Sequence, residues 1–263
     1  MVYRERSVKT EGVVLKHHDW GEADRLLILF TRELGRVQAI AKGVRKPRSR
    51  KAGHVEPFTR AKLLLARGRD LYILTQAEAI ETYQNIKKDL LSMSYGFYVI
   101  ELLHNFTYEE GENRDLYRLL VNTLDRLNRE DDPKILTHYY EIRLLDFAGF
   151  RPQLFFCTEC EKEIIAEDQY FSAIQGGVLC PNCGRRSAGS QPISKDALRY
   201  LRHFQRSSYR EATKARIKHE INIEIENLLQ FYITNILERV LNTPSFIKRI
   251  KKERILTIEE DSS

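Results

Sequence analysis

The sequence lacks any uninterrupted run of 18 apolar residues, and its first residues, Met-Val-Tyr-Arg-Glu-Arg, lack the apolar core of a signal peptide. We therefore expect neither a membrane-spanning helix nor a secretory leader, and we predict a soluble, cytoplasmic protein. The 263 residues, of which 42% are hydrophobic, are enough to bury a sizeable core, spread over two or three domains.

The short motifs that mark common enzyme sites are also missing. The sequence contains no Gly-x-x-x-x-Gly-Lys phosphate loop, no Gly-x-Gly-x-x-Gly, no His-Glu-x-x-His and no Gly-x-Ser-x-Gly. Its seven histidines show no spacing typical of metal ligands or of a catalytic triad. Since the paired acids Asp131 and Asp132 precede a predicted helix, capping explains them. We expect a binding protein with no catalytic residues.

Acidic residues are absent between Glu33 and Glu56, and this gap contains seven cations. Gly43 and Pro47 break the predicted strand that leads into the gap and turn it into an exposed loop. Clustered like charges repel one another unless a polyanion is near, so the loop is a candidate nucleic-acid site; the alternative is a solvated, mobile loop that binds nothing. The cations are Arg36, Lys42, Arg45, Lys46, Arg48, Arg50 and Lys51.

The excess positive charge lies in the first third of the chain. Residues 1–81 hold 17 Lys or Arg against 10 acids, whereas residues 82–263 hold 26 against 27. This division predicts that the N-terminal third faces a polyanion.

Hydrophobic patterning predicts an α+β protein with several domains. Five short strands without intervening helices, at residues 7–16, 25–31, 37–42, 58–66 and 71–80, favour a small closed barrel of the oligonucleotide-binding (OB) type, although the pattern alone leaves other small barrels open. Helical periodicity starts at Asp89, and Asp132 and Ser194 are predicted to cap later helices. The predicted domains are a barrel (1–81), a helical domain (82–151 and 194–247), an inserted cysteine module (152–193) and a frayed tail (248–263).

Four cysteines form two Cys-x-x-Cys pairs with 19 residues between them, and Gly184, directly after the last cysteine, is expected to relieve a turn. This spacing predicts one tetrahedral Zn²⁺ site, which is structural because four thiolates leave no position for a reactive water. Four metal-free thiols or two disulfides are the alternatives. The module holds three cations against five acids, so we expect it to stabilise the fold or dock a partner and to avoid DNA. The ligands are Cys157, Cys160, Cys180 and Cys183.

Two further features are candidate binding surfaces. Trp20 could stack bases beside the basic loop, with Phe58 and Tyr72 as other candidates, although each is a typical core residue. A cationic stripe at helical spacing could contact DNA or an acidic peptide, or could simply be solvated. Its members are Lys195, Arg199, Arg202, Arg206 and Arg210.

Three N-terminal segments resemble the barrel of the RecO family of bacterial recombination mediators. They are residues 11–15 (Glu-Gly-Val-Val-Leu), 21–26 (Gly-Glu-Ala-Asp-Arg-Leu) and 41–50 (Ala-Lys-Gly-Val-Arg-Lys-Pro-Arg-Ser-Arg). The order of barrel, helical domain and inserted cysteine module is also similar. Some members of the family lack the cysteines, whereas this chain has all four.

The resemblance implies an OB barrel that binds single- and double-stranded DNA and anneals complementary strands, in a protein associated with the nucleoid. It also implies partnership with RecR and with the acidic C-terminal tail of single-stranded DNA-binding protein, so that RecA can be loaded onto coated gaps. From charge alone, the stripe from Arg199 to Arg210 is our candidate for binding this tail. Two other functions stay open, namely RNA binding or transcription by a basic barrel with a zinc module, and an unrecognised nuclease.

Overall fold

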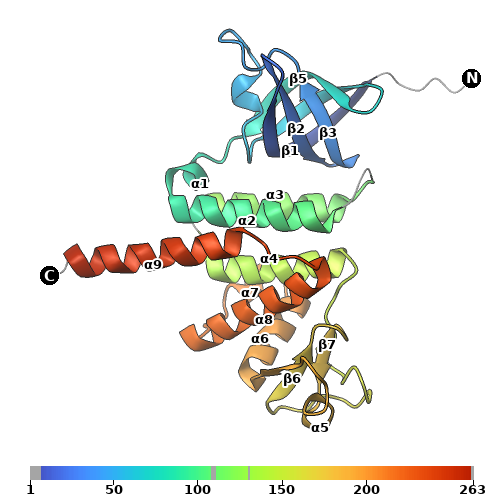
Figure 1. Cartoon of the computed structure of the whole chain (residues 1–263), viewed down its shortest axis with the longest axis vertical. Coiled ribbons are helices and arrows are strands. Elements are labelled where there is room, and N and C mark those ends of the chain that lie inside the picture. The colour runs from blue at the N-terminus through green and yellow to red at the C-terminus, as the bar shows by residue number, and fades with distance from the viewer. Residues whose placement is uncertain (1–6, 108–110, 130, 262–263) are drawn as a thin grey trace, which may run out of the picture. The chain divides into compact units, whose positions relative to one another are not determined.

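The computed structural model describes residues 7–107, 111–129 and 131–261, with side chains described as far as Glu253. The chain forms two compact units, residues 1–130 and 131–263 (Figure 1). This boundary lies within the segment predicted as the first part of a helical domain, and it groups the helices before Asp131 with the barrel. None of the described helices is long and apolar enough to cross a membrane.

The first unit contains a closed barrel of five strands in the order β1-β2-β3-β5-β4, which confirms the predicted fold (Figure 1). The long β1 pairs with both β2 and β4, and a bulge between Val14 and Lys16 shifts the register of its pairing with β2. Apolar side chains at alternate positions fill the interior. The strands are β1 (Ser7–Trp20), β2 (Asp24–Thr31), β3 (Gly35–Ala41), β4 (Arg60–Arg67) and β5 (Tyr72–Glu81).

Among the described residues, this unit also contains three α-helices: α1 (Gln84–Lys88), α2 (Leu90–Phe106) and α3 (Arg114–Asn128). Asp89, where helical periodicity was predicted to begin, caps α2 by accepting from the Ser92 backbone N–H. The helices are fixed to the barrel by the Tyr117 hydroxyl, which donates to Glu11 Oε1 at 2.9 Å.

The second unit is built around α4 (Pro133–Phe147), α6 (Lys195–Arg206), α7 (Tyr209–Ala212), α8 (His219–Leu237) and α9 (Thr243–Asp261). The predicted caps are present, because Asp132 accepts from Lys134 N and Ser194 accepts from Ala197 N. The frayed tail predicted at residues 248–263 is wrong for its described part, which belongs to α9; residues 262–263 lie outside the described chain.

The cysteine module contains β6 (Gln169–Ser172), β7 (Gly177–Leu179), β8 (Gln191–Ile193) and the single-turn α5 (Pro181–Gly184). The strands form a sheet in the order β7-β6-β8. Gly184 was expected to relieve the turn after the last cysteine. Its φ is not positive, and the reason for glycine is instead the Tyr170 ring, 2.3 Å from where a Cβ would lie.

Candidate nucleic-acid interface and metal centre

The basic loop, defined here as residues 42–51, starts from a fixed point on the barrel. The Gly43 backbone N–H donates to Asp24 Oδ1 at 2.7 Å, and the Arg45 N–H donates to the Ala23 carbonyl at 2.9 Å. Gly43 has a φ of +63°, which suits glycine at this turn. Val44 is buried in the barrel core. The start of the loop is thereby tied to the turn between β1 and β2.

The end of the basic loop is tied to β5. Among the described residues, β3 pairs with β5 only at Ala39–Tyr72 and Ile40–Ile73, so β5 continues past β3 without a strand neighbour on that side. Lys51 Nζ donates to the Leu74 carbonyl at 3.2 Å, and the Ala79 N–H donates to His54 Nδ1 at 3.2 Å. These bonds use backbone groups at the open side of β5.

Five cations of the basic loop are exposed to solvent, and four of them differ from the fifth in their charge partners. In the part of the chain that the structure describes, no carboxylate forms an ion pair with any of the four. Arg45 is the exception in the loop, since its Nη2 lies 3.2 Å from Asp19 Oδ2, and Asp19 is itself 57% exposed. The four unpaired cations are Lys42, Lys46, Arg48 and Arg50.

Trp20 ends β1 next to this loop and is 49% exposed. Arg45 Nη1 also approaches the carbonyl oxygen of Gly21, at 3.4 Å, which places the turn after Trp20 beside the loop. The two other aromatic candidates were wrong. Phe58 is 1% exposed and packs on Phe97 with ring centroids 4.7 Å apart, and Tyr72 is 6% exposed in the barrel core.

Arg36 lies away from the loop cations, although it was grouped with them in the sequence. It is the second residue of β3, at the opposite end of that strand from the loop. Its Nη1 donates to the backbone carbonyl of His104 in α2 at 2.8 Å. The side chain therefore links the barrel to a helix.

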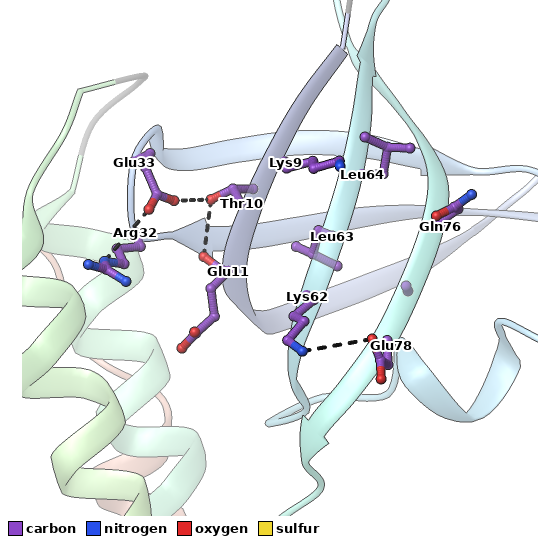
Figure 2. A pocket seen from close by; sticks show the side chains of 11 residues that line it. Lys9, Thr10, Glu11, Arg32, Glu33, Lys62, Leu63, Leu64, Gln76 and Glu78 are labelled. Atoms are coloured by element: carbon purple, nitrogen blue, oxygen red, sulfur yellow. Dashed lines mark hydrogen bonds and ion pairs between the residues drawn. The ribbon is translucent and has the colours of Figure 1, made fainter.

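The outer wall of the barrel has a groove of about 580 Å³ next to β1, β4 and β5 (Figure 2). Its three cations are matched by three acids, with Lys62 lying 4.0 Å from Glu78 and Arg32 lying 3.6 Å from Glu33. Thr10 donates to Glu33 in the same wall. Because the opposite charges cancel, this groove attracts a polyanion less strongly than the basic loop does.

The four cysteines converge as their spacing predicts. Their sulfur atoms all lie within 4.8 Å of one another, and Cys160 Sγ and Cys180 Sγ are 3.9 Å apart. Sulfurs about 2.3 Å from a tetrahedral ion would be about 3.8 Å apart, so the cluster can hold one metal ion. All four cysteines are free, which excludes the disulfide alternative for this structure.

Hydrogen bonds from the peptide backbone around the cluster favour the thiolate form of Cys157. The Cys180 N–H donates to Cys157 Sγ at 3.4 Å. Burial alone would raise the pKa of the Cys157 thiol, but backbone hydrogen bonds from Cys160, Cys180 and Glu159 lower this pKa to about 6. Metal ligation needs the thiolate form, which these backbone hydrogen bonds favour at Cys157.

The five residues of the predicted cationic stripe do not share one environment in the structure. Arg202 bonds the Leu154 carbonyl at 2.7 Å, and Arg199 lies 3.3 Å from Asp196 on its own helix. Lys195 and Arg206 are exposed on α6, whereas Arg210 belongs to the separate helix α7. The stripe is therefore not one continuous charged surface.

Sequence reasoning missed the groups that shape these sites. Asp24 and His54 hold the basic loop and the segment after it in place. They were missed because only cations and aromatic residues were predicted to belong to this site. The glycine at position 43 was the one available signal, because a tight turn with a free N–H needs an acceptor. No spacing rule connects His54 with Ala79, since their contact depends on how the barrel closes.

Comparison with known protein families gives matches along nearly the whole chain. Residues 5–83 match the family model "Recombination protein O N terminal", and residues 87–244 match "Recombination protein O C terminal". The chain is 35% identical over 249 residues to a protein named DNA repair protein RecO from Roseiflexus sp. (strain RS-1), covering 95% of this chain and 88% of that protein.

Two other relatives carry the same name. The protein from Dehalococcoides mccartyi (strain ATCC BAA-2266 / KCTC 15142 / 195) is 36% identical over 231 residues, which cover 88% of this chain and 91% of that protein. The protein from Symbiobacterium thermophilum is 32% identical over 247 residues, covering 93% and 98%.

Proposed function

The chain belongs to the recombination protein O family, which supports a role in DNA repair and recombination, and from that premise we propose that its barrel binds DNA and anneals complementary strands. The basic loop carries this proposal. It combines four exposed cations that have no described carboxylate partner with anchors at both ends, and Trp20 lies beside it.

The anchors matter because they lower the cost of binding. A mobile loop would have to lose conformational freedom when it meets DNA, whereas a loop already bonded to Asp24 and Leu74 loses less. The cations would neutralise DNA phosphates and release the counterions condensed on the DNA, and the exposed face of Trp20 would stack a base. We count Lys42, Arg45, Lys46, Arg48 and Arg50 as the DNA contacts and assign Arg36 and Lys51 mainly to the fold.

Annealing follows from charge neutralisation and needs no covalent step. Two DNA strands repel each other through their phosphates, and a concentrated set of cations lowers this repulsion while the bases pair. The same cations attract single and double strands alike, because phosphate contacts do not depend on sequence.

We assign Zn²⁺ to the four cysteines, with a structural role. Four sulfur ligands at tetrahedral spacing are typical of structural zinc sites, and they leave no position for substrate. The ion would join the segment before β6 to the segment that runs from the end of β7 into α5, in a module whose strands have only three or four residues.

We assign the partners that the family resemblance implies, namely RecR, the acidic tail of single-stranded DNA-binding protein and, indirectly, RecA. For the tail, a hollow of about 270 Å³ beside α6 is our candidate. Its lining contains three cations (Lys195, Arg199 and Arg202) against two acids (Glu167 and Asp196), together with Ile165, which is 64% exposed. Cations beside apolar surface suit an acidic peptide with apolar residues.

A strand-annealing assay tests the proposed function. Complementary oligonucleotides are coated with single-stranded DNA-binding protein, and the assay compares the wild type with a loop variant in which Arg45, Lys46, Arg48 and Arg50 are all replaced by Ala. We expect annealing without ATP or added metal, and a loss of at least tenfold in the loop variant.

A charge-matched control removes the same number of cations from elsewhere in the first unit. Lys9, Arg32 and Lys62 line the mixed-charge groove, and Arg118 is 71% exposed on α3. Replacing these four by Ala should leave annealing within about twofold of the wild type. Equal losses in both variants would show that net charge matters and the loop does not. A preference for RNA, or metal-dependent cutting of the strands, would favour the other two functions.

A further inference from the structure

A second combination of aromatic rings and unpaired cations lies in the other unit, where α6 ends beside the cysteine module. The Arg206 guanidinium carbon is 3.6 Å from the centre of the Phe155 ring, and the Arg202 guanidinium carbon is 5.0 Å from the same ring. No ion pair to Arg206 is found in the part of the chain that the structure describes. The ring therefore positions a cation whose charge is available.

Next to this pair, Phe156 presents its ring to solvent with 48% of its surface exposed. The segment is held in place because Gln153 Oε1 accepts from the backbone N–H of Phe155 at 3.0 Å and of Phe156 at 3.4 Å. Arg151 and Arg206 line the same hollow as both rings, and its volume is about 300 Å³.

The charge near this hollow favours an anion. Arg151 is half exposed and lies 3.8 Å from Asp146, which also pairs with Arg143. Glu163, opposite Phe156 in an isolated β-bridge, is the nearby acid on the module. Arg151, Arg202 and Arg206 outnumber Asp146 and Glu163, so the net charge around this hollow is positive.

We propose that Phe156, Arg206 and Arg151 form a second site for single-stranded DNA. A base stacks on the exposed Phe156 ring, and Arg206, held by Phe155, binds a neighbouring phosphate with Arg151. An exposed ring beside stacked guanidinium groups suits a nucleotide better than it suits an acidic side chain, which has no flat face to stack. The inference rests on the proposed function, because a protein that anneals strands gains from holding DNA on each of its two units.

The test uses the full chain and two non-complementary oligothymidylates, one with a donor dye and one with an acceptor dye. Energy transfer reports both strands on one protein, and donor anisotropy reports binding of one strand. In the variant F156S/R206Q we expect the second strand to bind roughly tenfold more weakly, while the first strand binds as it does to the wild type. F156W should retain the second strand, because it keeps an exposed ring.

The chain provides a matched control in the same unit. Arg249 lies over the Phe246 ring at 5.1 Å on α9, and Phe246 is 37% exposed, so F246S/R249Q removes the same chemistry elsewhere. This control should keep the energy transfer. Equal melting temperatures and metal contents in all variants would show that folding is unchanged.

The other outcomes overturn the inference in distinguishable ways. Unchanged energy transfer in F156S/R206Q, or a wild type that never binds a second strand, removes the second site and leaves the basic loop unaffected. An acidic decapeptide whose binding depends on Phe156 and Arg206, while the second strand does not, would make this a peptide site. If the wild type binds no oligothymidylate at all, the proposed function itself fails.

Discussion

Lys51 Nζ lies 3.2 Å from the carbonyl oxygen of Leu74 and bonds the end of the basic loop to β5. Lys51 and Arg48 are close in sequence and carry the same charge, yet only Lys51 has a described protein partner. The two residues should therefore contribute to different properties of the protein.

Replacing Lys51 by Met should lower the free energy of unfolding by about 1 kcal/mol, because the Leu74 carbonyl loses a charged donor. The slope of log K against log salt for oligothymidylate binding should change little. Replacing Arg48 by Ala should leave stability within about 0.5 kcal/mol and reduce the slope by about 0.7. Urea denaturation and a salt titration of DNA binding measure the two effects. The assignment is wrong if Lys51→Met reduces the salt slope and Arg48→Ala lowers the stability.

A second prediction concerns the pH dependence of stability. Burial would raise the pKa of the Glu11 carboxyl, but hydrogen bonds from Arg60 and Tyr117 outweigh it and hold this pKa below its ordinary value of 4.5. A lowered pKa in the folded state stabilises the protein above about pH 4.5, and that contribution is lost as the pH falls below this value. Glu11→Gln should cost about 1–2 kcal/mol near neutral pH and progressively less in acid.

Urea denaturation at about pH 7 and about pH 3.5 checks this expectation. Glu78→Gln is the control, since Glu78 is 76% exposed and lies 4.0 Å from its described partner, Lys62. The control should show no difference in unfolding free energy at either pH. A Glu11→Gln effect that is the same at both values would contradict the proposed role of the ionised carboxylate.

The third prediction is that the metal stabilises the second unit. Cys180→Ser together with Cys183→Ser should abolish binding of one Zn²⁺ per chain and lower the melting temperature by at least about 5 °C, because two of four ligands are lost. A zinc-sensitive dye and calorimetry provide the measurements. Ser187→Ala, just after α5, should change neither quantity. An unchanged melting temperature in a zinc-free double variant would refute the structural role.

Local sequence patterns predicted the parts of the fold that depend on neighbouring residues. Alternating apolar residues gave the strands, and Asp89, Asp132 and Ser194 gave the starts of three helices. The Cys-x-x-Cys pairs predicted a cluster of four sulfurs because the ligands of such a site follow a fixed spacing.

The features that prediction missed depend on contacts between distant residues. Phe58 follows the basic loop in sequence, yet its ring packs on Phe97 of α2 and is buried. Arg206 was assigned to a charged helix face. Its contact with Phe155 joins two residues that are far apart in the sequence, and helical periodicity cannot reveal such a contact. The tail was expected to fray because its charge pattern resembles a solvated segment, whereas Thr243–Asp261 forms a helix.

The salt dependence of DNA binding tests the central claim most directly. If five loop cations contact single-stranded DNA, log K for an oligothymidylate should fall with log salt at a slope of about −3.5. The variant that lacks Arg45, Lys46, Arg48 and Arg50 should retain a slope of about −0.7. The charge-matched variant of Lys9, Arg32, Lys62 and Arg118 should keep the wild-type slope. A wild-type slope near zero, or the same slope in wild type and loop variant, would contradict the account.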